Sequence, residues 1–186
     1  MRSQVRGATQ SAWQIVAASS ADLLREQQVD LWDSGKQSGD STLHVPYNGP
    51  ALRSSQEVYW RVRSWDEQDR PSSWSPIARF TMGMLYERDW RAQWIVAPWQ
   101  TESVLMRKSF RVRPGLKRAV AHVCGLGHFE MSLNGRKSGD GLLAPGWTKY
   151  NRTCLYETHE ITQLLEQGEN VVGLVLGDGM YHTERR

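Results

Sequence analysis

The chain alternates short runs of β-forming residues with turn residues, and this pattern constrains its fold more than any other feature. Ser11–Ala18 reads SAWQIVAA, and Glu57–Trp65 reads EVYWRVRSW with strict alternation of side-chain type. Gly, Asn and Pro interrupt the sequence between such runs every few residues, as in Asn48-Gly49-Pro50. Many short strands at close and regular spacing predict an all-β chain built from β-sandwiches.

The strand predicted at Glu57–Trp65 has two chemically different faces, because side chains alternate along a strand. Trp60 and Val62 fall on one face, and we expect them in the core. Arg61 and Arg63 fall on the other, where their guanidinium groups can stack on Trp74. Each such cation–π contact contributes about 0.5–1 kcal/mol when exposed.

The second half of the chain repeats the strand pattern, with one strong turn and one short helix. Asn134-Gly135 predicts a type I′ hairpin turn, since both central positions require a positive φ. Thr162 is predicted to cap a helix over Gln163–Gln167, with Gly168 after its last turn. In the first half, Ser20 is likewise predicted to cap a helix over Ala21–Gln27. The strands expected in the second half cover residues 104–112, 119–127, 129–135 and 170–178.

The length of 186 residues favours two small domains. We predict a first domain over 1–83, a linker over 84–93 and a second domain over 94–186. Tyr86, Trp90 and Trp94 are expected to pack where the two domains meet.

Composition excludes several classes of protein. The 23 basic and 20 acidic residues are spread along the chain, which argues against a nucleic-acid partner. No apolar run approaches the ~20 residues of a membrane span, so no membrane partner is expected. No signal peptide is visible at the N-terminus, and the expected localisation is cytoplasmic. Cys124 and Cys154 are too few and too far apart for a disulfide framework and are predicted to be free thiols.

Several motifs in the first half resemble a fibronectin type III-like domain. They read QSAWQIVAASSADLL, LWDSGKQSG, VPYNGPAL, YWRVRSWDEQDRPSSWS and ARFTMG. In this order they are similar to the domain that opens bacterial α-L-rhamnosidases. Such a domain normally has a strand before the one at Trp13, whereas here only the polar MRSQVRGATQ precedes it. An open sheet edge is therefore expected.

The second half resembles the jelly-roll, galactose-binding-like domain that follows in the same enzymes. The motifs LNGRKSG and ITQLLEQGENVVGLVL are shared with β-galactosidase-like enzymes, whereas LLAPGWTKYNRTCLYET and GDGMY point to the rhamnosidases. Two departures are that Met180 stands where the family usually has Trp and that the chain stops at HTERR. We therefore expect a truncated jelly-roll with exposed strand edges, and pairing of these edges between two copies would form a homodimer.

The resemblance implies a parent enzyme that hydrolyses terminal α-L-rhamnose by an inverting mechanism. Its catalytic carboxylates would belong to a downstream α/α toroid domain, the expected partner of this chain. A glycosidase needs two suitably spaced carboxyl groups, and no convincing pair is visible here. The acidic residues considered are Glu130, Asp140, Glu157, Glu160 and Asp178. We predict that they are solvated or cap turns, and no catalytic residue is assigned.

Sugar recognition requires an aromatic face and planar polar groups, and one part of the chain supplies both. The candidate carbohydrate-binding residues are Trp147, Tyr150, Asn151, Arg152, Asp178 and Tyr181. The ligand would be a rhamnose-containing glycan. The alternative is that Trp147 and Tyr181 pack against the downstream domain. A different class of function, a fibronectin-like protein–protein interaction module without sugar binding, also stays open.

Metal and cofactor sites are not predicted. His128, His159 and His182 lie on separate segments without the short spacing of zinc ligands. A calcium site through Asp140 and Asp178 has no supporting pattern. The glycine pairs at 125–127 and 177–179 do not open a helix, as a nucleotide site would require, and are predicted to be tight turns.

Overall fold

The computed structural model describes residues 7–98 and 103–181 and divides into two compact units, Met1–Ala92 and Gln93–Arg186. We call them the N-terminal unit and the C-terminal unit. Strands hold 37% of the chain and helices 6%, and all strand pairs are antiparallel among the described residues. The predicted all-β fold class is therefore confirmed.

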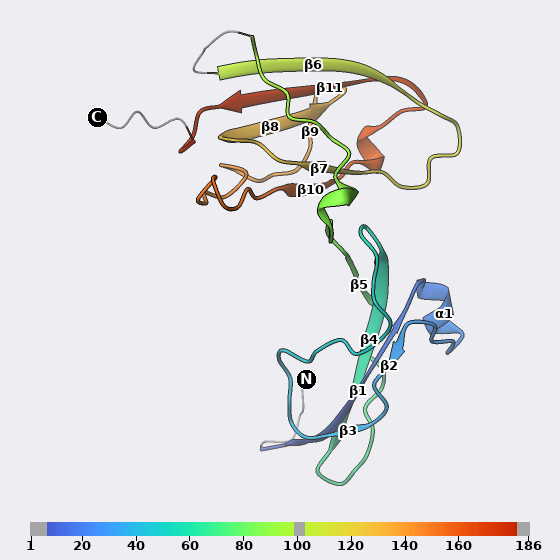
Figure 1. Cartoon of the computed structure of the whole chain (residues 1–186). Helices are drawn as coiled ribbons and strands as arrows, with labels where there is room; N and C mark the ends of the chain where they lie inside the picture. Colours follow the sequence, from blue (N-terminus) through green and yellow to red (C-terminus); the bar gives the residue numbers. More distant parts are fainter. Residues whose placement is uncertain (1–6, 99–102, 182–186) are drawn as a thin grey trace. The chain divides into compact units, whose positions relative to one another are not determined.

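The N-terminal unit is built on one sheet whose strand order is β2-β1-β4-β5, with β3 also paired to β1 (Figure 1). Its centre is the long antiparallel pair of β1 and β4, in which Ala18 faces Tyr59 and Trp13 faces Ser64. Both long strands lie where the sequence predicted them. The bounds are β1 (Gln10–Ala18), β2 (Trp32–Asp33), β3 (Gln37–Ser38), β4 (Glu57–Asp66) and β5 (Ala78–Thr81).

The core of this unit differs from the prediction. On β4 the buried apolar residues are Val58 and Trp65, whereas Trp60 and Val62 are half-buried. The alternation of side chains was interpreted as placing the core on the face of Trp60 and Val62. Instead both faces are covered in part, since Tyr59 on the opposite face packs on the buried cluster of Val16, Ala18 and Leu24.

The short helix α1 (Ala21–Arg25) places Leu24 in that cluster. Ser20 caps it as predicted, because its hydroxyl accepts a hydrogen bond from the Leu23 amide at 3.3 Å. The helix is shorter than expected and ends before Gln27, which has a positive φ of 59°.

The predicted stacking of arginines on Trp74 is confirmed. The guanidinium carbons of Arg61 and Arg63 each lie 4.7 Å from the centre of the Trp74 ring. Arg63 also lies 4.8 Å from the ring centre of Trp65. The segment that carries Trp74 is thereby attached to one face of β4.

The C-terminal unit contains two sheets, of order β6-β11-β8-β9 and β10-β7. Its core joins both sheets: Phe129, Met131 and Leu133 of β8 pack with half-buried residues of β7 and β11. All four strands predicted here are present. The bounds are β6 (Ser103–Val112), β7 (Val120–Val123), β8 (His128–Leu133), β9 (Arg136–Lys137), β10 (Glu157–Glu160) and β11 (Gly168–Gly177).

Asn134 and Gly135 form the predicted tight turn between β8 and β9, with φ values of 52° and 78°. The predicted helix over Gln163–Gln167 is wrong. A single 3-10 turn, η2 (Thr162–Leu164), takes its place, and Thr162 does not cap it. The Thr162 hydroxyl instead accepts a hydrogen bond from the Ala119 amide at 2.8 Å, a partner 43 residues away.

A second 3-10 turn, η1 (Glu87–Asp89), lies in the segment predicted to be a linker. Tyr86 and Trp94 on either side of this turn are exposed within the described residues. Within those residues, no helix has the length and apolar character needed to cross a membrane.

Candidate functional site

The predicted carbohydrate-binding residues lie on two segments of the C-terminal unit. The first is the loop between β9 and β10, and the second is the turn that follows β11. Tyr150 of the loop and Tyr181 of the turn meet edge to face, with ring centres 5.3 Å apart and planes at 88°. The Tyr150 hydroxyl is buried and has no hydrogen-bond partner.

The other residues of the loop are presented to solvent. Trp147 keeps 68% of its surface exposed, and Asn151 and Arg152 are also exposed. A tight turn holds this segment, because the Lys149 carbonyl accepts hydrogen bonds from the amides of Arg152 and Thr153 at 2.8 and 2.9 Å. The structure therefore brings Tyr150 and Tyr181 together and leaves the planar polar groups of the loop accessible.

Two glycine turns position the segment after β11. Gly127 has a φ of 122°, and a Cβ atom there would lie 2.2 Å from the Gly177 carbonyl oxygen. Gly179 has a φ of 53°, and a Cβ there would come within 3.2 Å of Gly127. The two turns thus lie against each other, at a distance that only glycine permits. Asp178 lies in the second turn, where its carbonyl accepts a hydrogen bond from the Tyr181 amide at 3.2 Å.

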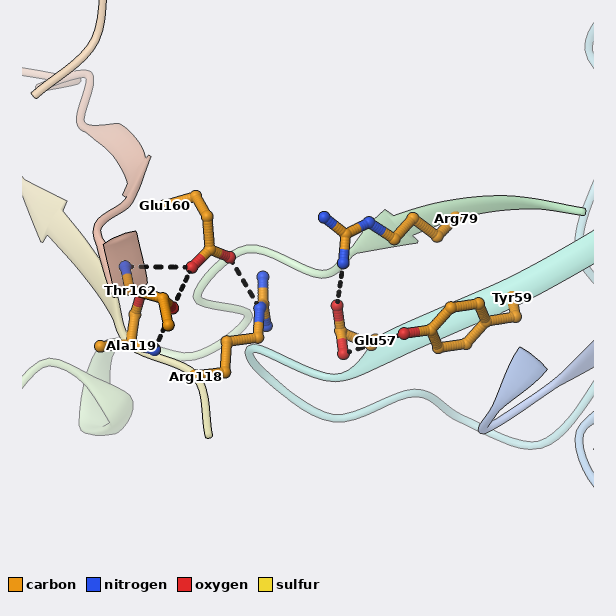
Figure 2. Close-up of polar contacts among 7 residues, drawn as sticks. All are labelled: Glu57, Tyr59, Arg79, Arg118, Ala119, Glu160 and Thr162. Carbon is orange, nitrogen blue, oxygen red and sulfur yellow. Dashed lines mark hydrogen bonds and ion pairs between the residues drawn. The ribbon is translucent and has the colours of Figure 1, made fainter. Parts of the chain in front are cut away.

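Three of the acidic candidates lie beside cationic or titratable partners. Glu130 pairs with Lys137 at 2.6 Å, and Glu157 lies 3.5 Å from His159. Figure 2 shows Glu160 bonded to Thr162 and, at 2.8 Å, to Arg118. The hydrogen bond from Thr162, followed by those of Arg118, lowers the pKa of Glu160 despite partial burial. A general acid of a glycosidase needs a raised pKa, so this environment acts in the opposite direction.

A similar acidic contact occurs in the N-terminal unit. Glu57 accepts hydrogen bonds from Arg79 at 3.2 Å and from the Tyr59 hydroxyl at 3.4 Å (Figure 2). Arg79 and Tyr59 are paired across β4 and β5, which places both beside Glu57. The contact between Glu57 and Arg79 thus links β5 to β4 through side chains.

Cys154 lies beside the tyrosine pair, because its thiol donates a hydrogen bond to the Tyr150 carbonyl at 3.5 Å. His159 packs edge-on against Phe129, with ring centres 6.2 Å apart, and His182 lies outside the described residues. Within residues 7–98 and 103–181, no group of three His, Cys, Asp or Glu side chains is placed to hold a metal ion. Both cysteines are free, as predicted. Burial, together with the neighbouring Cys154 thiol, raises the pKa of Cys124.

The N-terminal unit contains a groove that was not predicted from the sequence. It is lined by Trp13 and Trp32 and by polar residues of the connection that follows β3. Trp13 was predicted to lie in a strand, whereas the segment that carries Trp32 was interpreted as turns between short extended pieces. A signal was present in retrospect, since Trp, Asp, Gln, His and Asn side chains gather within residues 32–48.

Comparison with known proteins assigns both parts of the chain. Residues 1–86 match the family described as the Rha78A-like, N-terminal immunoglobulin domain. Residues 115–186 match the family described as the alpha-L-rhamnosidase N-terminal domain. An α-L-rhamnosidase from Formosa agariphila is 36% identical over 95% of this chain, which corresponds to 20% of that protein. One from Alteromonas sp. is 34% identical over 96% of this chain and 21% of its own length.

The structural comparison agrees with these matches. The structure of an α-L-rhamnosidase from Dictyoglumus thermophilum superposes with a TM-score of 0.90 at 30% identity, covering 97% of this chain and 22% of that one. The chain spans about a fifth of the length of the curated relatives it matches. With its two halves matched to two successive domains of the same enzymes, the chain belongs to the α-L-rhamnosidase family and corresponds to the N-terminal region of its members.

Proposed function

We propose that this chain is the non-catalytic accessory region of an α-L-rhamnosidase and that it packs on a linked catalytic domain. That domain would hydrolyse terminal α-L-rhamnose with inversion. The observation that carries the proposal is the extent of the similarity: 95% of this chain aligns with only 20% of the Formosa agariphila relative. The rest of such an enzyme has room for the catalytic carboxylates.

The exposed aromatic residues of the C-terminal unit support a packing role. Trp147 and Tyr181 keep 68% and 50% of their surface exposed, although burial of large aromatic side chains is favourable. Such residues are enriched at protein–protein interfaces. We assign to these two side chains the contact with the linked domain.

A hydrolysis assay tests the first part of the proposal. The purified 186-residue chain is incubated with p-nitrophenyl α-L-rhamnopyranoside, beside the full-length parent enzyme as positive control. We expect release of p-nitrophenol by the parent and none by the chain. Turnover by the chain that survives repurification would show that it carries its own catalytic residues.

Substitutions in the full-length parent test the packing role. Trp147→Ala and Tyr181→Ala are each expected to lower its stability by about 1 kcal/mol or more, the loss typical of an anchoring interface residue. The matched control is Leu116→Ala, an exposed apolar residue in the connection after β6. Equal melting temperatures for all three variants and the parent would contradict the assignment.

A second candidate function is direct sugar contact at the pair of Tyr150 and Tyr181. One observation favours it: the Tyr150 hydroxyl is buried without a partner, and buried polar groups nearly always have one. A sugar hydroxyl would satisfy it, with Asn151, Arg152 and Asp178 as further contacts. Trp147 would then offer a stacking surface.

Calorimetric titration of the chain with L-rhamnose tests this candidate. Removal of the hydroxyl in Tyr150→Phe should weaken binding by up to about tenfold, the value of one neutral hydrogen bond. The ring contact with Tyr181 is kept in that variant, so folding should be preserved. Absence of heat at millimolar rhamnose would remove direct sugar binding at this site.

The finer topologies are also part of the proposal. We assign a fibronectin type III-like sandwich to the N-terminal unit and a jelly-roll to the C-terminal unit. The antiparallel sheets of both units support this assignment, and immunoglobulin and fibronectin type III domains share the sandwich architecture. We also propose that the edge strand β6 allows pairing between two copies, which sedimentation analysis would detect as a dimer.

A further inference from the structure

The groove on the N-terminal unit has the size and lining of a small-molecule site. Its volume of about 380 Å³ falls in the range of roughly 300–1,000 Å³ that such sites occupy. Two half-buried tryptophans contribute to its wall, Trp13 and Trp32. The rest of the lining includes the polar residues Asp33, Gln37, His44 and Asn48 and the apolar residues Leu43, Val45 and Pro46.

Strand register explains why the two tryptophans meet in one groove. Trp13 is paired with Gln37 across β1 and β3, and Ala17 is paired with Trp32 across β1 and β2. Paired residues share a face of a sheet, and so do residues four apart on one strand, such as Trp13 and Ala17. Trp13, Trp32 and Gln37 therefore lie on the same face. Figure 1 shows the long connection from β3 to β4. His44 and Asn48 of this connection also line the groove.

The side chains that would contact a ligand are held in place by their neighbours. The Trp32 ring meets Tyr47 edge to face, with centres 5.3 Å apart, and the Tyr47 hydroxyl donates a hydrogen bond to the Pro50 carbonyl at 3.1 Å. Asp33 is paired with Val16, so its side chain lies on the opposite face of the sheet. There its carboxylate accepts hydrogen bonds from Gln14 at 2.7 Å and from the Gly35 amide at 2.8 Å, which fix β2 against β1 beside Trp32. The groove is thus preorganised, which lowers the entropic cost of binding.

We propose that this groove binds a neutral pyranose residue of a glycan. An indole face matches the apolar face of a pyranose ring, and side-chain amide groups match pairs of neighbouring hydroxyls. The side-chain amides of Gln37 and Asn48 bind these hydroxyls. The groove lies wholly within the N-terminal unit, so the proposal goes beyond the function proposed above and does not depend on the tyrosine pair.

Titration of the isotope-labelled chain with methyl α-L-rhamnopyranoside, followed by NMR, tests the proposal. A second titration uses methyl β-D-glucopyranoside to separate rhamnoside selectivity from general pyranose binding. We expect saturable shifts at millimolar sugar of the Trp13 and Trp32 indole signals and of the Gln37 and Asn48 side-chain amides. No saturable shift at these positions with either glycoside would overturn the proposal, even if signals of Tyr150 and Tyr181 move.

Two variants establish which groups bind. Asn48→Ala and Gln37→Ala each remove an exposed amide, and each should weaken binding several-fold to about tenfold. If Gln37→Ala unfolds the sheet edge, as a melting curve would reveal, Asn48→Ala and the shifts of the unmodified chain still decide the question. Trp147→Ala on the C-terminal unit should leave the titration of the groove unchanged. Unaltered affinity in a folded Gln37→Ala and in Asn48→Ala would overturn the assignment.

Discussion

The side-chain amide of Asn134 donates a hydrogen bond to the side-chain oxygen of Asn170 at 2.8 Å. Asn134 forms the β8–β9 turn, and Asn170 lies in β11 with 1% of its surface exposed. Asn170 also accepts a hydrogen bond from the Glu166 amide at 2.9 Å and donates to the carbonyls of Glu166 and Gly168. One buried amide thus satisfies the backbone of the bend that leads from η2 into β11.

Replacing Asn170 by Ala should therefore be strongly destabilising. The change leaves the Asn134 side chain and partly buried backbone groups of Glu166 and Gly168 without these partners, each at a cost of about 1–3 kcal/mol, so we expect a loss of about 3 kcal/mol or more. Chemical denaturation of the chain measures it. Asn151→Ala, at an exposed position, is the control and should change the stability by less than about 0.5 kcal/mol. A midpoint for Asn170→Ala equal to that of the control would refute the role assigned to this amide.

The stacking of Arg61 and Arg63 on Trp74 should appear as coupling energy. A double-mutant cycle with Arg63→Met and Trp74→Leu isolates the pair, since methionine keeps the apolar stem and removes the charge. We expect a coupling of about 0.5–1 kcal/mol. The cycle with Arg79→Met and Trp74→Leu is the control, because Arg79 pairs with Glu57 instead. Strictly additive losses in the first cycle would show that the contact contributes nothing.

Lowering the pH should destabilise the C-terminal unit in part through Glu160. Its hydrogen bond from Thr162 and its pairing with Arg118 lower its pKa below the unfolded value of 4.5. The stabilisation is therefore present above that value and is lost as the pH falls through the lower folded-state pKa. Melting temperatures from about pH 6 to about pH 3 should fall less steeply for Glu160→Gln than for the parent. Parallel curves would contradict this linkage.

The thiol of Cys124 should react slowly with alkylating agents at neutral pH. Burial, and then the neighbouring Cys154, raise its pKa, so the thiolate that reacts is scarcer than in the unfolded chain. Iodoacetamide labelling followed by peptide mass spectrometry should give a lower rate for Cys124 in the native chain than in urea, with a steep rise at alkaline pH. Labelling of Cys124 at equal rates in the native chain and in urea would contradict a raised pKa of this thiol in the folded state.

Gly49 should be required for the shape of the groove. A Cβ atom at this position would lie 2.3 Å from the Tyr47 hydroxyl oxygen and 2.6 Å from the Leu31 carbonyl oxygen. Gly49→Ala must therefore displace Tyr47, which contacts the Trp32 ring. We expect a shift of the Trp32 indole signal and a stability loss of about 1–3 kcal/mol, typical of overpacking. Gly141→Ala is the control, because Gly141 also lacks a positive φ and the nearest atom would lie 4.0 Å from the added Cβ.

Much of the local structure was predictable from neighbouring residues. The strands at Glu57–Trp65 and Ser11–Ala18 follow from runs of β-forming residues. The Asn134-Gly135 turn follows from two residue types that accept a positive φ, and the Ser20 cap follows from the place of this serine before a helix. The stacking on Trp74 also followed from the parity of Arg61 and Arg63. These features depend on interactions within a few residues or on which face of one strand a side chain occupies, so the sequence by itself determined them.

The tertiary structure decided which side chains from distant segments meet. Thr162 bonds Ala119 instead of capping a helix, Tyr150 meets Tyr181, and Trp13 shares a groove with Trp32. The burial of Val58 and Trp65 in place of Trp60 and Val62 likewise depends on what covers each face of β4. Pairing partners, register and the path of the connections fix these contacts, and the period of a single strand carries no information about any of them.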